Sequence, residues 1–177
     1  MLDIVPQSIV KTLDAMNIAQ GMVVADFGTG SGFVSLELAK RVGDTGTVYA
    51  IDILQEPLEV LESKARQANY TNIKIITSDL EKQNGSTLEN DSCDWVVISN
   101  ILFQASNQQA IAAEAMRILK PKAKIAVIEW HPEKMIARYA HRPLSQDQTK
   151  KLFEQAHLKL VSQFEPDAMH YGMIFQK

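Results

Sequence analysis

The sequence contains a single cysteine, Cys93, and therefore no pair that could form a disulfide within the chain. We take this as a sign of a reducing compartment and expect a cytoplasmic protein. Basic residues are not in excess either: 18 Lys and Arg stand against 21 Asp and Glu, and the net charge of -3 does not indicate a nucleic acid partner. No apolar run approaches the roughly 20 residues that cross a bilayer. The first residues include an early acid and no basic region, so we expect neither a membrane span nor a signal peptide.

What the sequence does contain is typical of a globular domain. Of its 177 residues, 46% are hydrophobic and 22% are charged, which are ordinary values for a folded chain. With roughly 150 residues per domain as a guide, we expect a single domain over residues 1–177. A chain of this length can bury a core without a metal or a disulfide.

Short apolar runs alternate with longer amphipathic segments. The segments predict helices over 6–16, 33–42, 54–65 and 111–119, and Ser145 with Gln148 forms a capping-box pattern that starts a last helix. Residues 81–91 are polar and predict a loop. The apolar runs predict strands over 22–27, 47–51, 73–77, 95–99 and 123–130, followed by an antiparallel hairpin of 158–164 and 171–175. Such alternation predicts an α/β fold with a parallel sheet covered on both faces, which binds ligands beyond the carboxyl ends of its strands.

Three glycines at alternate positions follow the first predicted strand, in the run Asp26-Phe27-Gly28-Thr29-Gly30-Ser31-Gly32. With no side chains in the way, a ligand can lie against the backbone, near the amides that open the next helix. A plain tight turn would explain one glycine, but not three that follow an aspartate. We therefore expect a ligand-binding loop here.

Polar residues also end the next three predicted strands. Asp52 could accept hydrogen bonds from both hydroxyls of a ribose, although an aspartate in this place also caps helices. Asp79 and Leu80 could contact the amine and the ring of an adenine, but Asp79 could equally form a turn. Asn100 ends the fourth strand, and the apolar residues 101–103 after it could line a pocket or face the core.

Five segments of the chain form one combined pattern. They are VVADFGTGSGF at 23–33, VYAID at 48–52, TSD at 77–79, DWVVISNIL at 94–102 and RILKPKAKIAVIEW at 117–130. Together they resemble the class I S-adenosylmethionine-dependent methyltransferases, and the resemblance covers nearly the whole chain. It implies a Rossmann-like, doubly wound and mostly parallel seven-stranded sheet with an antiparallel C-terminal hairpin, and S-adenosyl-L-methionine as the cofactor.

The resemblance also implies which residues bind that cofactor. Its methionine part would be surrounded by Asp26, Gly28, Gly30 and Gly32, and its ribose would be held by Asp52. Its adenine would be contacted by Ile53, Asp79 and Leu80, and Asn100 would lie beneath the methionine end. The charge of Asp26 agrees with this assignment, because an aspartate in a partly desolvated cleft attracts an amine and a sulfonium.

Within the family, the segment HRPLSQDQTKKLFEQA at 141–156 resembles the small quinone-biosynthesis and arsenite methyltransferases. Arsenite enzymes hold their substrate with several cysteine thiolates, and this chain has only Cys93, so we do not expect arsenic methylation. The turn before the fifth predicted strand, Lys120-Pro121-Lys122-Ala123-Lys124, departs from the glycine pair that the family usually has there. The departure leaves the geometry of this turn open.

A catalytic base is needed only if the acceptor must lose a proton, because methyl transfer depends mainly on alignment and exclusion of water. His131, after the fifth strand, is the candidate base, or else a solvent-facing loop residue; His141 and His170 are weaker candidates. No histidines or cysteines have the spacing of metal ligands, so we expect no metal site.

Four further residues are candidates for contact with the acceptor. Trp130 and Phe103 could line its pocket or pack in the core. Arg138 and Tyr139 belong to the irregular stretch 131–143, and long loops without regular structure are often functional.

The function that we expect is transfer of a methyl group from S-adenosylmethionine to a small-molecule acceptor by in-line displacement. One alternative is an NAD(P)-dependent oxidoreductase, but these enzymes favour G-x-G-x-x-G, whereas Gly28, Gly30 and Gly32 form G-x-G-x-G. The other alternative is a non-catalytic cofactor-binding module. Because the chain holds little beyond the cofactor core, we expect an acceptor site that is open or completed by a second copy in a homo-oligomer.

Overall fold

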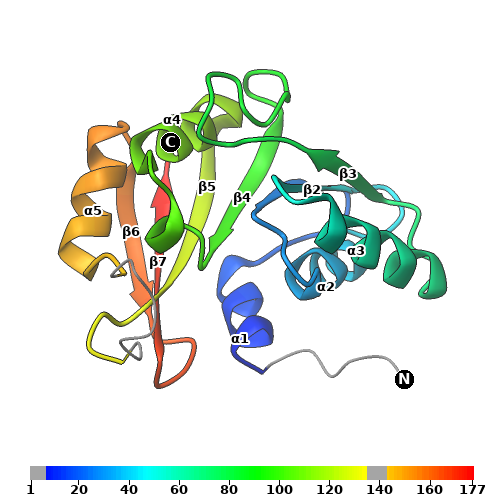
Figure 1. The fold of residues 1–177 in the computed structure, drawn as a ribbon, viewed down its shortest axis with the longest axis horizontal. Coiled ribbons are helices and arrows are strands. Elements are labelled where there is room, and N and C mark those ends of the chain that lie inside the picture. The colour runs from blue at the N-terminus through cyan, green and yellow to red at the C-terminus, as the bar shows by residue number, and fades with distance from the viewer. Residues whose placement is uncertain (1–6, 135–142) are drawn as a thin grey trace.

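Seven strands form one mixed sheet in the order β3-β2-β1-β4-β5-β7-β6 in the computed structural model of the chain (Figure 1). The structure describes residues 7–134 and 143–177. The first five strands pair in parallel, and β7 runs antiparallel to both β5 and β6. The strands are β1 (Val23–Phe27), β2 (Thr47–Asp52), β3 (Ile73–Thr77), β4 (Cys93–Ser99), β5 (Leu119–Trp130), β6 (Lys159–Phe164) and β7 (His170–Gln176). The predicted Rossmann-like sheet with its antiparallel hairpin is confirmed.

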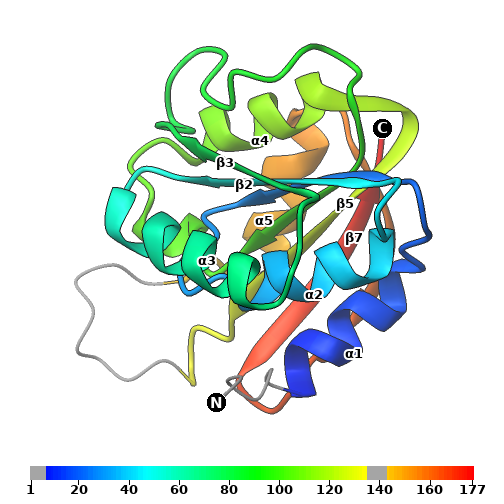
Figure 2. The ribbon, with the colours of Figure 1, turned by 90° about the vertical axis from the view of Figure 1, so that its right-hand side faces the viewer.

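Helices cover both faces of the sheet (Figure 2). On one face lie α1 (Gln7–Met16), α2 (Phe33–Val42) and α3 (Gln55–Gln67), and on the other lie α4 (Gln108–Ile118) and α5 (Gln146–Gln155). A short 3-10 helix, η1 (Leu102–Gln104), follows β4. No helix among the described residues is long and apolar enough to cross a membrane.

Each central strand contributes side chains to two separate hydrophobic cores, because successive side chains point to opposite faces of the sheet. In β1, Phe27 packs into the core beneath α4 and α5, whereas Val24 packs into the core formed with α1 and α2. Both residues are fully buried. Strands that are covered on both faces have continuous apolar sequences, and for this reason they could be predicted from the sequence.

The carboxyl ends of β1 and β4 lie side by side at the point where the strand order reverses. From β1 the sheet continues to β2 and β3 on one side, and from β4 to β5, β7 and β6 on the other. The connections that follow β1 and β4 leave in opposite directions at this point, and a crevice therefore opens beyond the ends of the two strands. The loops that follow β1 and β4 therefore form its walls.

The predicted start of β5 was wrong by four residues, because the strand begins at Leu119 and not at residue 123. Leu119 pairs with Cys93, but the next regular pair joins Lys124 to Trp95, so residues 120–123 form an irregularity in the ladder. Pro121 has no N–H to donate and fits in a strand at such a place. Lys122 adopts a positive φ of 66°, so a lysine takes the left-handed conformation at the turn where the family usually has glycines.

Candidate cofactor-binding site

A cavity of about 580 Å³ opens at the carboxyl ends of β1, β2, β3 and β4. Its volume lies within the range of roughly 300–1,000 Å³ that is usual for small-molecule sites. Gly32, one of the predicted cofactor residues, is not part of its lining. The other eight predicted residues all line it: Asp26, Gly28, Gly30, Asp52, Ile53, Asp79, Leu80 and Asn100.

The three glycines after β1 have different roles. A Cβ atom on Gly30 would meet open space, with only the Gly28 carbonyl oxygen near it at 3.9 Å. A Cβ on Gly28 would overlap the side chain of Ile101, and one on Gly32 would come within 2.7 Å of Leu61. We expected all three to make room for a ligand. The structure shows that two of them make room for protein side chains, and that Gly30 leaves the backbone open to the cavity.

Asp26 is a buried carboxyl beneath the first turn of α2. The hydroxyl of Ser35 donates to its Oδ2 atom at 2.6 Å, and the hydroxyls of Thr29 and Ser35 lie 2.7 Å apart. Burial raises the pKa of Asp26 to about 6, against the opposing effect of the hydrogen bond from Ser35. A carboxylate in such a place is stabilised by any cation that reaches the cavity wall.

Asp52 connects the glycine-rich loop after β1 to the segment that precedes α3. Its Oδ2 atom accepts a hydrogen bond from Gly30 N, and its Oδ1 atom accepts one from Leu54 N, each at 3.0 Å. The contact with Leu54, the residue before α3, fits the helix-capping role that we considered. Because each carboxylate oxygen can accept two hydrogen bonds, both oxygens keep a free site for hydroxyl groups of a ligand.

At the far end of the cavity, polar and apolar groups lie together. Asp79 Oδ1 accepts a hydrogen bond from Glu81 N at 3.0 Å, which is the turn role that we considered for Asp79. Leu80 is buried, whereas Ile53 is 60% exposed at the cavity mouth. An exposed isoleucine beside a buried leucine offers apolar surface on which a planar ring could lie.

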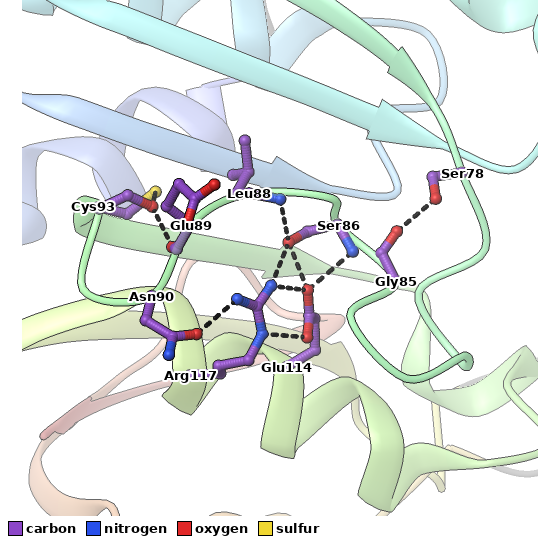
Figure 3. Close-up of polar contacts among 10 residues, drawn as sticks. Ser78, Gly85, Ser86, Leu88, Glu89, Asn90, Cys93, Glu114 and Arg117 are labelled. Carbon is purple, nitrogen blue, oxygen red and sulfur yellow. Dashed lines mark hydrogen bonds and ion pairs between the residues drawn. The ribbon is translucent and has the colours of Figure 1, made fainter.

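The loop between β3 and β4 is fastened to α4, as Figure 3 shows. Ser78 Oγ donates to the Gly85 carbonyl, and Ser86 donates to Glu114 through both its hydroxyl and its N–H group. Arg117 donates two hydrogen bonds to Glu114, at 2.6 and 2.9 Å, and a third to Asn90 at 2.8 Å. Burial acts to raise the pKa of Glu114, but the hydrogen bonds from Arg117 and Ser86 hold it below its usual value. The network fixes the segment that carries Asp79 and Leu80.

At the end of β4, Asn100 lines the cavity in a left-handed conformation with φ of 57°. Its Oδ1 atom is buried and has no hydrogen-bond partner within the described part of the chain. The next turn is held by Glu129 of β5, whose Oε1 atom accepts from Leu102 N at 2.8 Å. Burial raises the pKa of Glu129 to about 7, against the opposing effect of nearby backbone N–H groups. Sequence reasoning missed Glu129, although a carboxylate within the apolar run IAVIEW was a signal.

His131 does not line the cavity. Its Nε2 atom lies 2.8 Å from the carboxylate of Glu165, and its Nδ1 atom lies 3.7 Å from that of Glu133. Each ring nitrogen therefore lies near an acidic side chain, and the residue is outside the cavity lining. His141, Arg138 and Tyr139 lie outside the described residues.

The apolar residues after β4 divide between the two roles that we considered. Ile101 lines the cavity, and Leu102 is fully buried in the core. Neither Phe103 nor Trp130 is part of the lining, and the ring of Trp130 packs against His170 with centroids 4.1 Å apart. Ile9 of α1, which the sequence did not single out, also lines the cavity.

Cys93 is fully buried in β4, and burial raises the pKa of its thiol to about 11. A protonated, enclosed thiol is a poor ligand for arsenite or for a metal. Among residues 7–134 and 143–177, no group of three His, Cys, Asp or Glu side chains comes together in a way that could hold a metal ion.

The residues present fit S-adenosylmethionine. The open face of Gly30 leaves space against the backbone, and the carboxylates of Asp26 and Asp52 suit an amine and a pair of hydroxyls. The unpartnered Oδ1 atom of Asn100, which also lines the cavity, adds a buried acceptor. Fold and site together define a Rossmann-like nucleoside-binding domain with an acidic cavity at its switch point.

Comparison with known proteins identifies the family. The sequence family described as "Methyltransferase domain" matches residues 18–169, and the chain therefore belongs to that family. The predicted resemblance is confirmed, and with it the choice of methyltransferase over oxidoreductase as the class of protein.

Individual relatives agree with this class. The chain is 26% identical over 118 residues to a demethylmenaquinone methyltransferase of Geobacillus sp. (strain WCH70), a match that covers 67% of this chain and 49% of that protein. The crystal structure of a SAM-dependent methyltransferase from Aquifex aeolicus superposes with a TM-score of 0.83 at 26% identity, covering 95% of this chain and 88% of that one. An arsenic(III) S-adenosylmethionine methyltransferase from Chlamydomonas reinhardtii shares the fold, with a TM-score of 0.72 at 22% identity and coverage of 90% and 64%. The chain spans about half the length of the first curated relatives that it matches.

Proposed function

We propose that this protein is an S-adenosylmethionine-dependent methyltransferase that acts on a small aromatic acceptor with an ionisable hydroxyl, such as a quinol. The observation that carries the proposal is the convergence of eight predicted cofactor residues on one cavity at the switch point of the sheet. The quinol class is supported by the demethylmenaquinone methyltransferases among the relatives.

Each wall of the cavity has a distinct part in this proposal. Asp26 binds the amine of the cofactor, and Asp52 binds its ribose hydroxyls while holding Gly30 and Leu54 in place. Asp79 accepts the adenine amine, with apolar contacts from Ile53 and Leu80. Asn100 closes the methionine end.

The sulfonium of the bound cofactor supplies an activated methyl group and a good leaving group. The task of the protein is then to align the acceptor behind that methyl group and to exclude water. Apolar Ile101 and Ile9 on the cavity wall serve the second purpose.

We also propose a cytoplasmic location and a single domain over residues 1–177. The single buried thiol of Cys93 is compatible with a reducing compartment. A homo-oligomer that completes the acceptor side stays a prediction, and light scattering of the purified protein tests it. A species of one chain that still turns over the acceptor would contradict it.

Asp52→Ala tests the cofactor assignment. The change removes the proposed acceptor for the ribose hydroxyls, and each hydrogen bond to a charged group is worth roughly 1.5–3 kcal/mol, so we expect S-adenosylhomocysteine to bind at least about 10-fold more weakly. Titration calorimetry measures the affinity, and Asp52→Asn, which keeps one oxygen for Leu54 N, should weaken binding with less loss of stability.

The exposed Asp44 provides a matched control, because Asp44→Ala removes an acid from a turn outside the cavity lining. Unchanged affinity in Asp52→Ala would refute the ribose role. No binding to the unaltered protein would refute the methyltransferase proposal, and tight binding without transfer of a labelled methyl group to 1,4-naphthoquinol would favour the non-catalytic module.

A further inference from the structure

Asp167, in the turn between β6 and β7, and His170, the first residue of β7, form a pair that contacts Asn100 of the cavity lining. Nδ1 of His170 lies 2.8 Å from Oδ1 of Asp167 and 3.0 Å from Oδ2. The same Oδ1 atom accepts hydrogen bonds from the backbone N–H groups of Met169 and His170. The turn therefore fixes the carboxylate, and the carboxylate fixes the ring.

The carboxylate also determines which nitrogen of the ring carries the proton. An ionised carboxylate can only accept hydrogen bonds, so the neutral ring of His170 has its proton on Nδ1 and a lone pair on Nε2. Partial burial acts to raise the pKa of Asp167, but the hydrogen bonds from His170 and Met169 hold it below its usual value. Asp167 therefore stays ionised at neutral pH, and Nε2 is a hydrogen-bond acceptor.

This acceptor nitrogen faces the side-chain amide of Asn100. Nε2 of His170 lies 3.5 Å from Nδ2 of Asn100. An amide has a donor NH2 group on one arm and an acceptor oxygen on the other, and an oxygen placed against the lone pair of Nε2 would be repelled. The contact thus sets the orientation of the amide, with Nδ2 turned to His170 and Oδ1 as the remaining arm.

The oxygen arm has no hydrogen-bond partner among residues 7–134 and 143–177. Oδ1 of Asn100 is nevertheless buried. Buried polar atoms nearly always have a partner, so each exception needs an explanation. Because Asn100 lines the cavity, a donor group on a bound ligand would supply the partner that is missing.

The place of Asn100 in the sheet indicates which donor this is. Strand β1 is the neighbour of β4, and Asp26 is in register with Val97, three residues before Asn100. Asp26 lies on the face covered by α2, since its carboxyl is bonded to Ser35. His170 projects from the same face of the sheet, because it precedes by four residues a side chain of β7 that packs in the core with α1 and α2. In the strand order, Asn100 stands between the carboxylate proposed to bind the amine and the histidine.

The ring of His170 is held on its other sides as well. It packs on the indole of Trp130, with the ring centroids 4.1 Å apart, and the two residues are in register at the end of β5. The turn between β6 and β7 lies at the same edge of the sheet as the carboxyl end of β5 (Figure 1). The side chain of His170 is only 15% exposed. The ring therefore has little freedom to change the nitrogen that it presents to Asn100.

We propose that Asp167 and His170 are positioning residues, which hold the amide of Asn100 with its Oδ1 atom as an acceptor for the ammonium group of S-adenosylmethionine. This rests on the proposed methyltransferase function. An ammonium group has three donor hydrogens, so it can bond to Asp26 and to Asn100 together. The turn between β6 and β7 thus determines, through two side chains, whether the cavity offers an acceptor or a donor at this point.

Asp167→Asn tests the proposal by reversing the ring. The new side-chain amide can donate to Nδ1, so the ring proton moves to Nε2, which then attracts Oδ1 of Asn100. The amide of Asn100 would present its NH2 group to the ammonium, and two donors repel. We expect S-adenosylhomocysteine to bind at least about 10-fold more weakly. 5′-Methylthioadenosine has the same nucleoside and sulfur but no amine, and its affinity should change less than about 3-fold. Titration calorimetry measures both affinities.

The same change in a second background separates positioning from support of the turn. In His170→Gln the residue that faces Asn100 has no ring proton to place. Adding Asp167→Asn to this variant should therefore lower the affinity for S-adenosylhomocysteine less than about 3-fold further. A merely structural Asp167 would cost the same affinity in both backgrounds, because its contact with the backbone N–H group of Met169 is present in each.

A control and a spectrum complete the test. Asp147→Asn makes the same substitution at an exposed aspartate in the first turn of α5, and it should leave the affinity for both ligands unchanged. Long-range 1H–15N spectra of the histidine rings need no ligand. His170 should show a protonated Nδ1 in the unaltered protein at neutral pH and a protonated Nε2 in Asp167→Asn.

Each outcome has one meaning. Equal loss of affinity for the two ligands in Asp167→Asn, no loss for either, or the same loss in both backgrounds would overturn the positioning role and leave the methyltransferase proposal intact. A protonated Nε2 of His170 in the unaltered protein would do the same. Failure of the unaltered protein to bind either ligand would overturn the proposed function itself.

Discussion

Single carboxylates in this protein differ in charge state according to what surrounds them. Asp26 is buried against the hydroxyls of Ser35 and Thr29, and Glu129 is buried against backbone N–H groups; burial raises the pKa of each carboxyl. Glu114 is also buried, but a guanidinium and a serine hold its pKa low. The same residue type is therefore a partner in an ion pair at one site and a group near its ionisation point at another.

At the residue scale, Gly30→Ala and Gly32→Ala test which glycine leaves room for the ligand and which leaves room for a protein side chain. A Cβ on Gly30 meets open cavity, so we expect a backbone cost of only about 1 kcal/mol but at least a roughly 10-fold weaker affinity for S-adenosylhomocysteine. A Cβ on Gly32 presses on Leu61 of α3, so we expect a loss of roughly 2 kcal/mol of stability and an affinity within about 3-fold in the folded fraction. Calorimetry measures the affinity of both variants for S-adenosylhomocysteine, and thermal unfolding measures their stability. If the two variants lost affinity and stability to the same extent, the different roles of Gly30 and Gly32 would be contradicted.

At the scale of elements, the loops around the cavity are fixed by contacts from elements distant in sequence. The β3–β4 loop is fastened by Glu114 and Arg117 of α4, and the turn after β4 is fastened by Glu129 of β5. Helix α2 begins over Asp26 through Ser35. A cavity with walls held in this way is already shaped before a ligand arrives, which reduces the ordering cost of binding.

Glu114→Ala tests how much the fastening of the β3–β4 loop contributes. The change leaves the guanidinium of Arg117 and the N–H of Ser86 without their acceptor, and we expect a loss of roughly 2–3 kcal/mol in the free energy of unfolding. The affinity for S-adenosylhomocysteine should fall as well, because Asp79 and Leu80 lose their support. Urea unfolding measures the first effect, and the surface change Glu62→Ala on α3 is the control. A variant as stable as the parent would show that the network adds nothing.

At the scale of the whole molecule, stability against pH is a balance of groups with opposite shifts. A carboxyl whose pKa is raised by folding stabilises the protein at low pH and loses this contribution as the pH rises toward its folded value. A carboxyl whose pKa is lowered behaves in the opposite way. Asp26 and Glu129 belong to the first kind, and Glu114 and Asp167 to the second.

Glu129→Gln isolates one side of this balance. The pKa of Glu129 rises from 4.5 to about 7 on folding, so its protonated form contributes at pH 5 and this contribution is almost gone by pH 8. We expect the free energy of unfolding to fall by roughly 2–3 kcal/mol more in the parent than in Glu129→Gln between these pH values. Urea titrations of both proteins across the range give the difference, and parallel curves would show that Glu129 is not the titrating group.

The sequence by itself determined the sheet, the helices and eight of the residues that line the cavity. Strands buried on both faces must be apolar throughout, and helices beside them must carry an apolar stripe, so local patterns were enough to place both. The residues at the strand ends could be grouped from the chain alone, because parallel strands bring their carboxyl ends to one edge.

Only the tertiary structure decided which of these groups face the cavity and which serve the fold. Gly32, which we predicted as a cofactor residue, lies outside the cavity lining and packs against Leu61, and Glu129 was overlooked although it holds the turn after β4. His170 lies beside Asn100 because β7 runs antiparallel to β5, and His131 lies outside the cavity lining. Such assignments depend on distances between residues far apart in the chain, and a local pattern of residue types contains no information on those distances.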